Sequence, residues 1–360
     1  MTPSDTLRTR FAQARASGLR ARNAAEAIGV SEGQAIAAHA GPHDQPLRAV
    51  PLRTEWLAIL QALESCGPVM ALTRNESTVH EKTGVYRNLS ATGPVGLAVG
   101  EDIDLRLFFM HWHAGFAVTE VAVGAAAPAA LSLQFYDAAG LAVHKVFCKS
   151  ASDRPAFEAV MQRFAAPELQ PTFGLRKPRP APLPDGAIDA AAFIDAWGAM
   201  QDTHDFFGLL QQHKVERQQG LRLAQGRFTR RAPASAVRTL LQEASRGGEP
   251  IMVFVGSPGC IQIHTGPVRR VEPREIAGQP WLNVLDPGFN LHLREDAIAQ
   301  VWVVCKPTTD GTVTSLEAFD QEGELIAMFF GARKPGEAER DDWRALVAKA
   351  APESAAAEAA

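Results

Sequence analysis

The sequence is poor in cysteine, with four in 360 residues, at Cys66, Cys148, Cys260 and Cys305. No CxxC pair and no Cys/His ligand spacing occurs, which argues against zinc sites, iron–sulfur clusters and covalently attached c-type haem. Cysteines so far apart in so long a chain do not form a disulfide framework either. We expect them to be small, buried hydrophobic side chains.

Long apolar runs and an excess of positive charge are also absent. No stretch reaches the ~18 apolar residues of a membrane helix, and the Arg-rich N-terminus lacks the apolar core of a secretory signal. The formal net charge of −4 gives no general attraction to nucleic acid or anionic lipid. The sequence therefore predicts a cytoplasmic protein with no membrane insertion and no nucleic-acid partner.

Motifs of the common nucleotide-binding and hydrolytic enzymes are missing as well. There is no G-x-S-x-G elbow, no Walker loop, no H-E-x-x-H motif and no dinucleotide-binding fingerprint. Hydrolase, kinase and dehydrogenase activities therefore have no support in the sequence.

The sequence does contain an internal repeat. The segment Leu133–Gly140, an apolar stretch that ends in Asp-x-x-Gly, recurs as Leu316–Gly323, and each is followed by a second apolar stretch. Strand, turn and strand in this order are typical of a β-hairpin. Further matches lie upstream in the same order, for example Gly67–Met70 with Glu249–Met252. We interpret the chain as a duplication of two similar halves.

The repeat also predicts the domain organisation. We expect a first repeat over 1–166, a linker over 167–187, a second repeat over 188–345 and a disordered tail over 346–360. The linker is rich in proline, which lacks an N–H and fixes φ, so it should be extended. The Ala/Glu-rich tail offers little to pack.

Within each half, segments of helical periodicity precede a run of strands. In the first half, helices are predicted over 19–38 and 56–64, and strands follow at 69–73, 105–109, 116–123 and 131–135. Helices followed by strands indicate an α+β fold with a large antiparallel sheet in each half, because parallel sheets need alternating crossovers.

The second half opens with a segment that we predict to be one helix, over 190–213. Five of its residues recur at spacings of three or four: Phe193, Trp197, Met200, His204 and Phe207. This spacing puts them on one face. An imidazole there is either a hydrogen-bonded core histidine or a ligand to a flat apolar cofactor. Haem is such a cofactor, since it needs an imidazole for its iron, apolar walls and cations for its propionates.

Two arginines are candidates for contacts with such a cofactor. Arg217 follows the predicted helix and is either a solvated residue or a bidentate partner of a propionate. Arg106 alternates with Leu105 and Leu107 in a predicted strand, so it shares a face with Phe108. It is either an outward-facing charge or the polar member of a ligand cleft.

Three further histidines, His80, His111 and His113, are weaker candidate ligands. His80 lies in the polar segment 73–84, whose composition and terminal glycine favour a loop between strands.

Several motifs together are similar to one known family. They are Ala71–Gly84, Asp104–Phe109, Gln134–Phe147, Asp202–Phe207 and Phe329–Pro335. In these stretches the chain resembles the haemin-degrading, haem-trafficking family of HemS/ChuS type, and the resemblance extends over about 19–336. It implies a cytoplasmic protein of a bacterial haem-uptake system, with two similar α+β halves and haem b in a cleft against the second half.

The resemblance also implies roles for individual residues. His204 would bind the haem iron, with His80 as a possible second ligand. Arg106 would contact haem or its bound water on the distal side, which Phe108 would line. Cationic contacts near the propionates would come from Arg217, Lys306 and Arg333. Phe330 stands where some members carry a tyrosine that faces haem, so a phenolic hydrogen bond is missing there.

Two functions are compatible with these residues. The first is a carrier that receives imported haem and passes it on for iron release, with a haem importer and a downstream acceptor or reductase as partners. The alternative is a haem-degrading, oxygenase-like enzyme with an external electron donor, in which Arg106 would be the distal catalytic residue. A third interpretation is a protein that binds another apolar anion or a protein partner. We expect a monomer or a homodimer.

Overall fold

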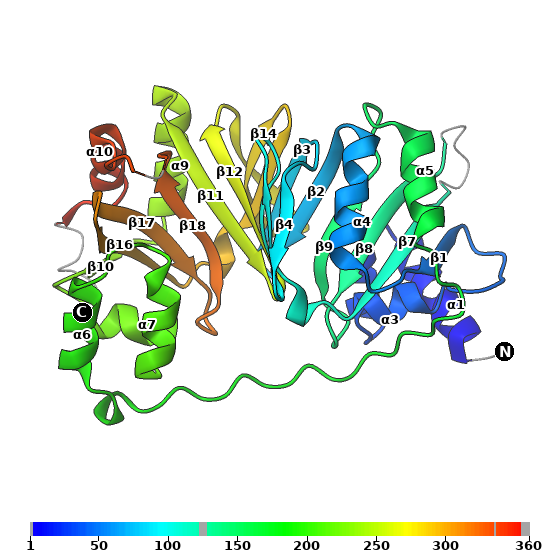
Figure 1. The fold of residues 1–360 in the computed structure, drawn as a ribbon, viewed down its shortest axis with the longest axis horizontal. Helices are drawn as coiled ribbons and strands as arrows, with labels where there is room; N and C mark the ends of the chain where they lie inside the picture. The colour runs from blue at the N-terminus through cyan, green and yellow to red at the C-terminus, as the bar shows by residue number, and fades with distance from the viewer. Residues whose placement is uncertain (1–2, 122–127, 335, 354–360) are drawn as a thin grey trace. The chain divides into compact units, whose positions relative to one another are not determined.

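The structure is a computed structural model that describes residues 3–121, 128–334 and 336–353 (Figure 1). The chain divides into two compact units. Unit 1 consists of residues 1–74, 80–178 and 256–262, and unit 2 of residues 75–79, 179–255 and 263–360. Each unit therefore includes a short segment from the other half of the chain.

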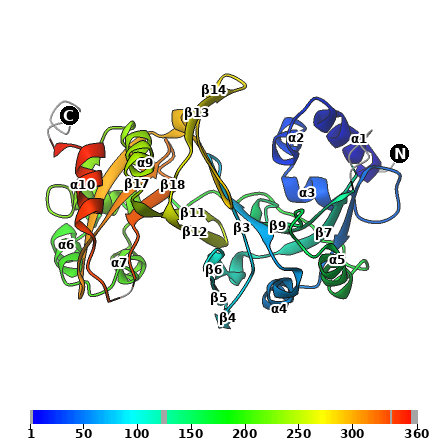
Figure 2. The ribbon, with the colours of Figure 1, turned by 90° about the horizontal axis from the view of Figure 1, so that it is seen from above.

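Unit 1 combines helices with antiparallel strands. Its helices are α1 (Pro3–Ala16), α2 (Ala21–Ala27), α3 (Glu32–Ala37), α4 (Trp56–Ala62) and α5 (Arg154–Arg163). Its strands are β1 (Leu47–Pro51), β2 (Val69–Arg74), most of β3 (Thr78–Gly84), β4 (Leu89–Thr92), β5 (Val95–Val99), β6 (Asp104–Phe108), β7 (Ala114–Glu120), β8 (Ala130–Tyr136) and β9 (Ala142–Phe147). Six strands lie in the order β1-β7-β8-β9-β2-β3, and three in the order β4-β5-β6. The helices α1, α2 and α3 pack against one another (Figure 2).

Unit 2 is built from the same kinds of elements. Its helices are α6 (Ala190–Gly198), α7 (Asp205–His213), α8 (Arg217–Leu223), α9 (Ala236–Gly247) and α10 (Asp341–Ala350). Its strands are β10 (Thr229–Ala232), β11 (Pro250–Ser257), most of β12 (Cys260–Pro267), β13 (Val271–Ile276), β14 (Gln279–Asp286), β15 (Phe289–Arg294), β16 (Gln300–Thr308), β17 (Gly311–Phe319) and β18 (Leu325–Gly331). Six strands lie in the order β10-β16-β17-β18-β11-β12, and three in the order β13-β14-β15.

The two halves of the chain have the same strand order. The order β1-β7-β8-β9-β2-β3 in the first half corresponds, strand by strand, to β10-β16-β17-β18-β11-β12 in the second. In each half the fourth to sixth strands form a separate run of three. Neighbouring strands such as β7 and β8, or β16 and β17, pair antiparallel. The predicted α+β fold with two similar halves and large antiparallel sheets is confirmed.

The hairpin predicted in each half is present. Asp137 accepts hydrogen bonds from the backbone N–H groups of Ala139 and Leu141, both at 2.9 Å, in the turn between β8 and β9. Gly140 in that turn and Gly323 in the turn between β17 and β18 both have φ of +79°. This left-handed conformation favours glycine, which explains the repeated Asp-x-x-Gly spacing.

Other predictions about the elements need correction. In each half one strand, β1 or β10, precedes the last of the opening helices, and a helix, α5 or α10, follows the sheet. The segment 73–84 is not a loop, because β3 covers Thr78–Gly84 and buries Thr78, His80 and Lys82. These side chains are buried although they are polar, which composition alone does not reveal. The predicted strand 116–123 ends as β7 at Glu120, and residues 122–123 lie outside the described residues.

The predicted disordered tail is wrong for residues 346–350. These residues belong to α10, which buries Trp343, Leu346, Val347 and Ala350 and packs beside α9 (Figures 1 and 2). The spacing of these apolar residues makes the helix amphipathic despite its alanine-rich composition. Gly331 leaves room for the Trp343 ring, because a Cβ at position 331 would lie 2.6 Å from the Trp343 Cγ. Residues 354–360 of the predicted tail lie outside the described residues.

The segment between the repeats contains little regular structure. Residues 170–184 form neither helix nor strand, and a 3-10 helix follows at Asp185–Ala187. Its beginning is attached to unit 1, where the His113 Nε2 is 2.8 Å from the Thr172 carbonyl oxygen and the Phe173 ring lies against Gly33. The domain boundaries assigned from the sequence stay a prediction.

The cysteines are all free, and two of them are fully buried as predicted. Burial raises the pKa of Cys66 to about 11 and that of Cys260 to about 12, so both thiols stay protonated at neutral pH. Cys148 and Cys305 are only half-buried, which corrects the prediction for them.

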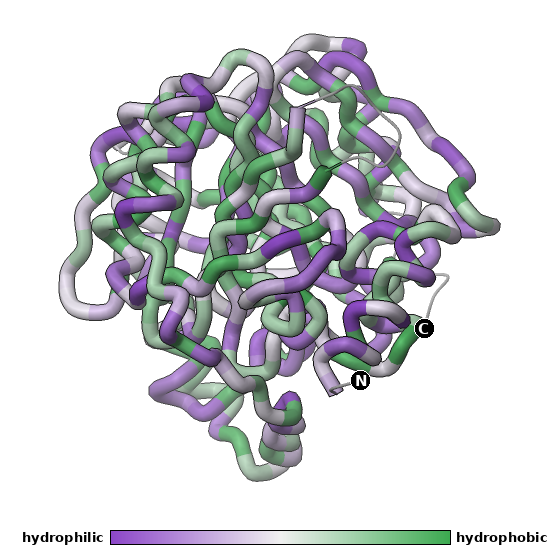
Figure 3. Tube along the Cα trace, turned by 90° about the vertical axis from the view of Figure 1, so that its right-hand side faces the viewer, coloured by the Kyte–Doolittle hydropathy of each residue, from purple (hydrophilic) through white to green (hydrophobic). Residues whose placement is uncertain are grey.

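The chain's hydrophobic segments are short and interrupted by hydrophilic ones (Figure 3). Among the residues that the structure describes, no helix combines the length and the apolar character needed to cross a membrane.

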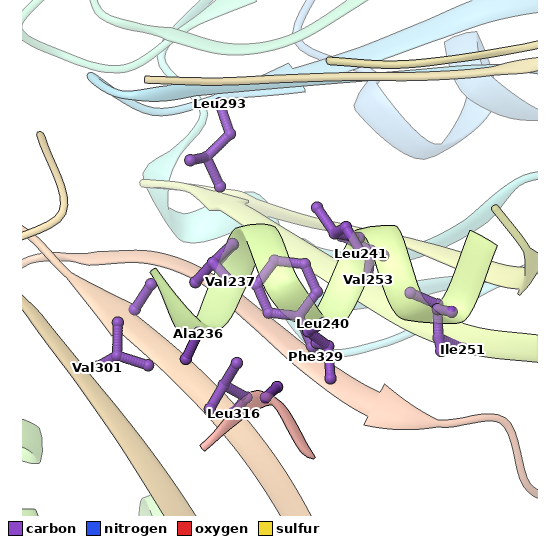
Figure 4. Packing of buried hydrophobic residues seen from close by; sticks show 14 of the residues in the cluster. Ala236, Val237, Leu240, Leu241, Ile251, Val253, Leu293, Val301, Leu316 and Phe329 are labelled. Carbon is purple, nitrogen blue, oxygen red and sulfur yellow. The ribbon is translucent and has the colours of Figure 1, made fainter. Parts of the chain in front are cut away.

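The main core of unit 2 lies around α9. Val237, Leu240 and Leu241 are fully buried and belong to one cluster with residues of the sheet such as Phe329 and Leu316 (Figure 4). Their spacing of three and four residues gives α9 a continuous apolar face.

Leu240→Ala should lower the free energy of unfolding by about 2–5 kcal/mol, because it removes a fully buried side chain and leaves a cavity. Denaturant titration followed by tryptophan fluorescence measures this loss. Arg246→Ala on the same helix is the matched control and should cost less than about 1 kcal/mol, since Arg246 makes an exposed ion pair with Glu243. Equal losses for the two variants would contradict the assignment of this core.

Candidate functional site

The segment predicted as one helix over 190–213 is broken. Helix α6 ends at Gly198 and α7 begins at Asp205. Between them the Asp205 carboxylate accepts hydrogen bonds from the backbone N–H groups of Gln201, at 3.2 Å, and Asp202, at 3.0 Å. Aspartates compete for backbone donors in this way and favour helix ends over helix interiors.

The break changes the position of His204. It is the N-cap residue of α7, and its side chain is 83% exposed. The aromatic residues Phe193 and Trp197 are buried, whereas Phe207 is 68% exposed. The prediction that His204 lies on one stripe with these aromatic residues is therefore wrong, because that stripe requires an unbroken helix.

Asp202 holds the imidazole of His204. The Asp202 Oδ1 accepts a hydrogen bond from the His204 backbone N–H at 2.8 Å and lies 2.6 Å from the ring Nδ1. The backbone N–H bond is the largest of the effects that lower the pKa of Asp202. An ionised carboxylate can only accept, so the neutral ring carries its proton on Nδ1 and keeps the lone pair on Nε2. Metal-binding histidines are oriented by a second partner in this way.

Two cations lie over an aromatic ring two residues beyond His204. The ring of Phe206 is buried against Trp197, with centroids 4.6 Å apart. The Arg217 guanidinium lies 5.2 Å and the Lys306 Nζ 4.7 Å from the centre of the Phe206 ring. The start of α7 thus brings the imidazole-bearing turn next to residues from α8 and β16.

A fully buried carboxylate joins these two cations. The Arg217 Nε and Nη2 donate to the two carboxylate oxygens of Glu317 on β17, at 2.9 and 2.8 Å. The Lys306 Nζ donates to the same carboxylate at 3.2 Å, and the Ser315 hydroxyl donates at 3.0 Å. The Glu317 side chain is 0% exposed and that of Arg217 is 23% exposed.

The charges of this cluster stabilise one another. Burial by itself would raise the pKa of Glu317, but the charges of Arg217 and Lys306 and the hydrogen bonds outweigh it and lower the pKa to about 2. Burial lowers the pKa of Lys306, and the Glu317 carboxylate opposes this effect. With all three groups ionised, the cluster carries one net positive charge.

Phe330 and Arg333 follow on β18 and just after it. The Phe330 ring centre lies 5.7 Å from the Lys306 Nζ, so the position at which the resemblance implied a tyrosine in some members adjoins the cluster. Arg333 pairs with Asp310, at 3.6 Å between Nη1 and Oδ2. The adjacent Thr309 N–H donates to the Gln201 carbonyl at 3.0 Å, which places Arg333 near the α6–α7 connection.

Arg106 and Phe108 are in unit 1, on the face of β6 that was predicted. Leu105 and Leu107 are buried, whereas Arg106 pairs with Asp104 and its side chain is 31% exposed. In the antiparallel register, Leu97 of β5 lies opposite Arg106 and Val95 opposite Phe108. The exposed face therefore combines one guanidinium with apolar side chains.

The remaining histidine candidates have different surroundings. His80 is fully buried in β3, with its Nδ1 2.9 Å from the Gln262 amide nitrogen. His113 is attached to Thr172, as described above, and His111 is exposed.

Two residues of the site were missed by sequence reasoning. Asp202 stands two residues before His204, and this short separation in the Asp-Thr-His motif was the available signal. Glu317 alternates with Ser315 and Phe319 along β17, a pattern that is equally typical of an outward-facing glutamate.

Comparison with known proteins identifies the family. The model of the haemin-degrading HemS/ChuX domain matches the chain twice, at residues 29–164 and 214–350. The chain belongs to this family. The double match agrees with the two similar halves of the fold.

Full-length relatives support the same assignment. The hemin transport protein HmuS of Yersinia pestis is 37% identical over 347 residues, which cover 96% of this chain and 97% of the relative. The structure of holo-PhuS, a heme-binding protein from Pseudomonas aeruginosa, is 47% identical with a TM-score of 0.89, and covers 96% of this chain and 98% of its own. The heme degrading enzyme ChuS of Escherichia coli O157:H7 is 36% identical with a TM-score of 0.87, and covers 97% of this chain and 100% of its own.

Glu317→Gln should lower the free energy of unfolding by about 3–5 kcal/mol near neutral pH, because it leaves buried Lys306 without its counter-charge. The folded-state pKa of Glu317, about 2, lies below the ordinary value of 4.5, so its contribution is complete above pH 4.5 and is lost as the pH falls towards 2.

The difference in unfolding free energy between the unsubstituted protein and the variant should therefore shrink as the pH falls from about 4.5 to about 2. Denaturant titrations at several pH values measure it. A difference that does not change with pH would contradict the ionised state of Glu317.

Proposed function

We propose that this chain binds haem in unit 2, with His204 as the iron ligand, and that it carries haem in a haem-uptake system. The observation that carries this proposal is the exposed His204 imidazole, whose Nδ1 is held by Asp202 and whose Nε2 lone pair is left for a metal. Haem iron needs one such nitrogen from the protein.

The surroundings of His204 fit the rest of the haem molecule. The exposed Phe207 offers apolar surface close to the imidazole. Arg217 and Lys306 supply cations for the propionates, and Arg217 has the planar fork that suits a carboxylate. Haem b fits better than a covalently attached haem, because the cysteines lack the C-x-x-C-H spacing.

The other implied contacts stay predictions. Arg106 and Phe108 offer a guanidinium and an apolar ring on an exposed strand face, which suits the predicted distal contact. Arg333 is a third propionate candidate, and His80 a second ligand that could reach iron only after leaving its buried position.

The relatives support the cellular role. HmuS is described as a hemin transport protein and PhuS as a heme-binding protein. We propose that this chain works in the cytoplasm, receives haem from an importer and passes it to an acceptor or a reductase.

His204→Ala should abolish the Soret band of imidazole-bound haem, because it removes the proposed iron ligand while His80 stays buried in β3. Titration of the purified protein with ferric haem, followed by absorption spectroscopy, measures binding and should saturate at about one haem per chain for the unsubstituted protein. His111→Ala is the matched control, an exposed histidine in unit 1 whose loss should change nothing. Asp202→Ala should weaken binding by about tenfold.

A variant that carries both His204→Ala and His80→Ala tests the ligand assignment as a whole. Unchanged affinity and an unchanged spectrum in this variant would show that the iron ligand lies elsewhere.

Haem degradation is the second candidate function. ChuS, at 36% identity over almost the whole chain, is described as a heme degrading enzyme. Arg106 is the residue that we propose on the distal side in that case, as a hydrogen-bond donor. The reducing equivalents would have to come from an external donor, because the sequence contains no flavin or nicotinamide motif.

Ascorbate added in air to the haem-loaded protein, with catalase present, separates the two functions. A carrier should keep the porphyrin intact, so the Soret band should persist. Decay of this band, with a linear tetrapyrrole identified by mass spectrometry, would favour the enzyme over the carrier. A parallel reaction with Arg106→Ala would then test the distal role of this residue.

A further inference from the structure

Glu317 is the only carboxylate within the polar cluster described above, and no family motif pointed to it. We propose that Glu317 is a positioning residue that, through Arg217 and Lys306, makes unit 2 selective for porphyrins with free carboxylates. This inference rests on the proposed haem binding and adds the residue that sets its specificity.

The geometry shows how Glu317 acts through Arg217. Its two oxygens bind one edge of the guanidinium, at Nε and Nη2, in a bidentate arrangement. The Phe206 ring lies 5.2 Å from the guanidinium carbon, and the Met328 sulfur is 3.2 Å from Nη2. Within the part of the chain that the structure describes, Nη1 makes no hydrogen bond, and the side chain is 23% exposed. The remaining donors of Arg217 are thus held ready for an external carboxylate.

The charge balance points to the same role. Without Glu317, Arg217 and the buried Lys306 would be two like charges side by side, and Lys306 would tend to lose its proton. With Glu317, both cations stay charged and one positive charge remains in excess. Since Arg217 alone would also carry one positive charge, Glu317 contributes chiefly the fixed orientation of the guanidinium, whose free donors suit a single propionate.

Unit 1 contains the corresponding positions with a different charge. Helices α3 and α8 both begin with a capping box, and their first residues are Glu32 and Arg217. Gln134 lies opposite Lys145 in the β8–β9 pair, as Glu317 lies opposite Met328 in the β17–β18 pair. Lys145 pairs there with the buried Glu32, at 2.5 Å, so this ion pair has no excess charge. The equivalent positions of the two units therefore carry different buried polar residues.

The buried ion pair of unit 1 also provides a matched control. Glu32→Gln removes a buried carboxylate from a lysine, as Glu317→Gln does, but at a position with no proposed ligand contact. A merely structural effect of losing a buried carboxylate would be common to the two variants, whereas an effect on carboxylate recognition would be confined to Glu317→Gln.

The test compares ferric haem with its dimethyl ester, in which both propionates are blocked. The full-length protein, Glu317→Gln and Glu32→Gln are titrated with each compound, and the ratio of the two dissociation constants is measured. We expect the unsubstituted protein and Glu32→Gln to prefer the free acid by about tenfold or more. In Glu317→Gln this ratio should fall towards one, while the Soret position stays unchanged because His204 is intact.

Iron-free protoporphyrin IX, followed by its fluorescence, separates carboxylate recognition from iron ligation. Its affinity should fall in Glu317→Gln and stay unchanged in His204→Ala. If Glu317→Gln does not fold, Arg217→Lys replaces it, since a lysine keeps the charge but cannot bind Glu317 with one edge and a propionate with the other. That variant should also lose the preference for the free acid.

The outcomes distinguish the two proposals. An unsubstituted protein that binds neither haem nor its ester would overturn the proposed function. Equal affinity of the unsubstituted protein for haem and its ester would overturn the recognition of carboxylates. A preference for the free acid that survives both Glu317→Gln and Arg217→Lys would overturn only the role of Glu317.

Discussion

The polar cluster of unit 2 depends on the buried carboxylate of Glu317. It binds Arg217 with two hydrogen bonds and Lys306 with a third, and its negative charge allows both cations to stay protonated in a buried setting. A buried charge is tolerated only when it is paired and hydrogen-bonded. Glu317 provides this pairing for Arg217 and Lys306, and the two cations provide it for Glu317. The positions of the two cations beside Phe206 follow from this arrangement.

The similarity of the two halves allows their buried polar residues to be compared position by position. Both halves have the same strand order and the same helix start with a capping box, so they offer equivalent positions for side chains. In unit 1 these positions hold Glu32, Gln134 and Lys145, and in unit 2 they hold Arg217, Glu317 and Met328. The backbone is thus repeated, while the buried polar residues differ in number and sign of charge.

Part of the candidate site could be predicted from the sequence. The alternation in β6 correctly placed Arg106 and Phe108 on one face, because side chains of a strand alternate whatever the strand packs against. The helical spacing around His204 was misleading, since it assumes an unbroken helix. Asp202 and Asp205 bind backbone N–H groups there and end the helical pattern, and side-chain capping of this kind outweighs periodicity.

The sequence by itself determined the α+β class, the two similar halves and the hairpin turns at Gly140 and Gly323. These features depend on local patterns and on motifs that recur in the same order, and both can be recognised without knowing any contact. Only the tertiary structure decided that His204 is exposed and held by Asp202, and that Glu317 joins Arg217 to Lys306. The first depends on where the helix breaks, and the second joins residues a hundred positions apart, which no single segment of sequence contains.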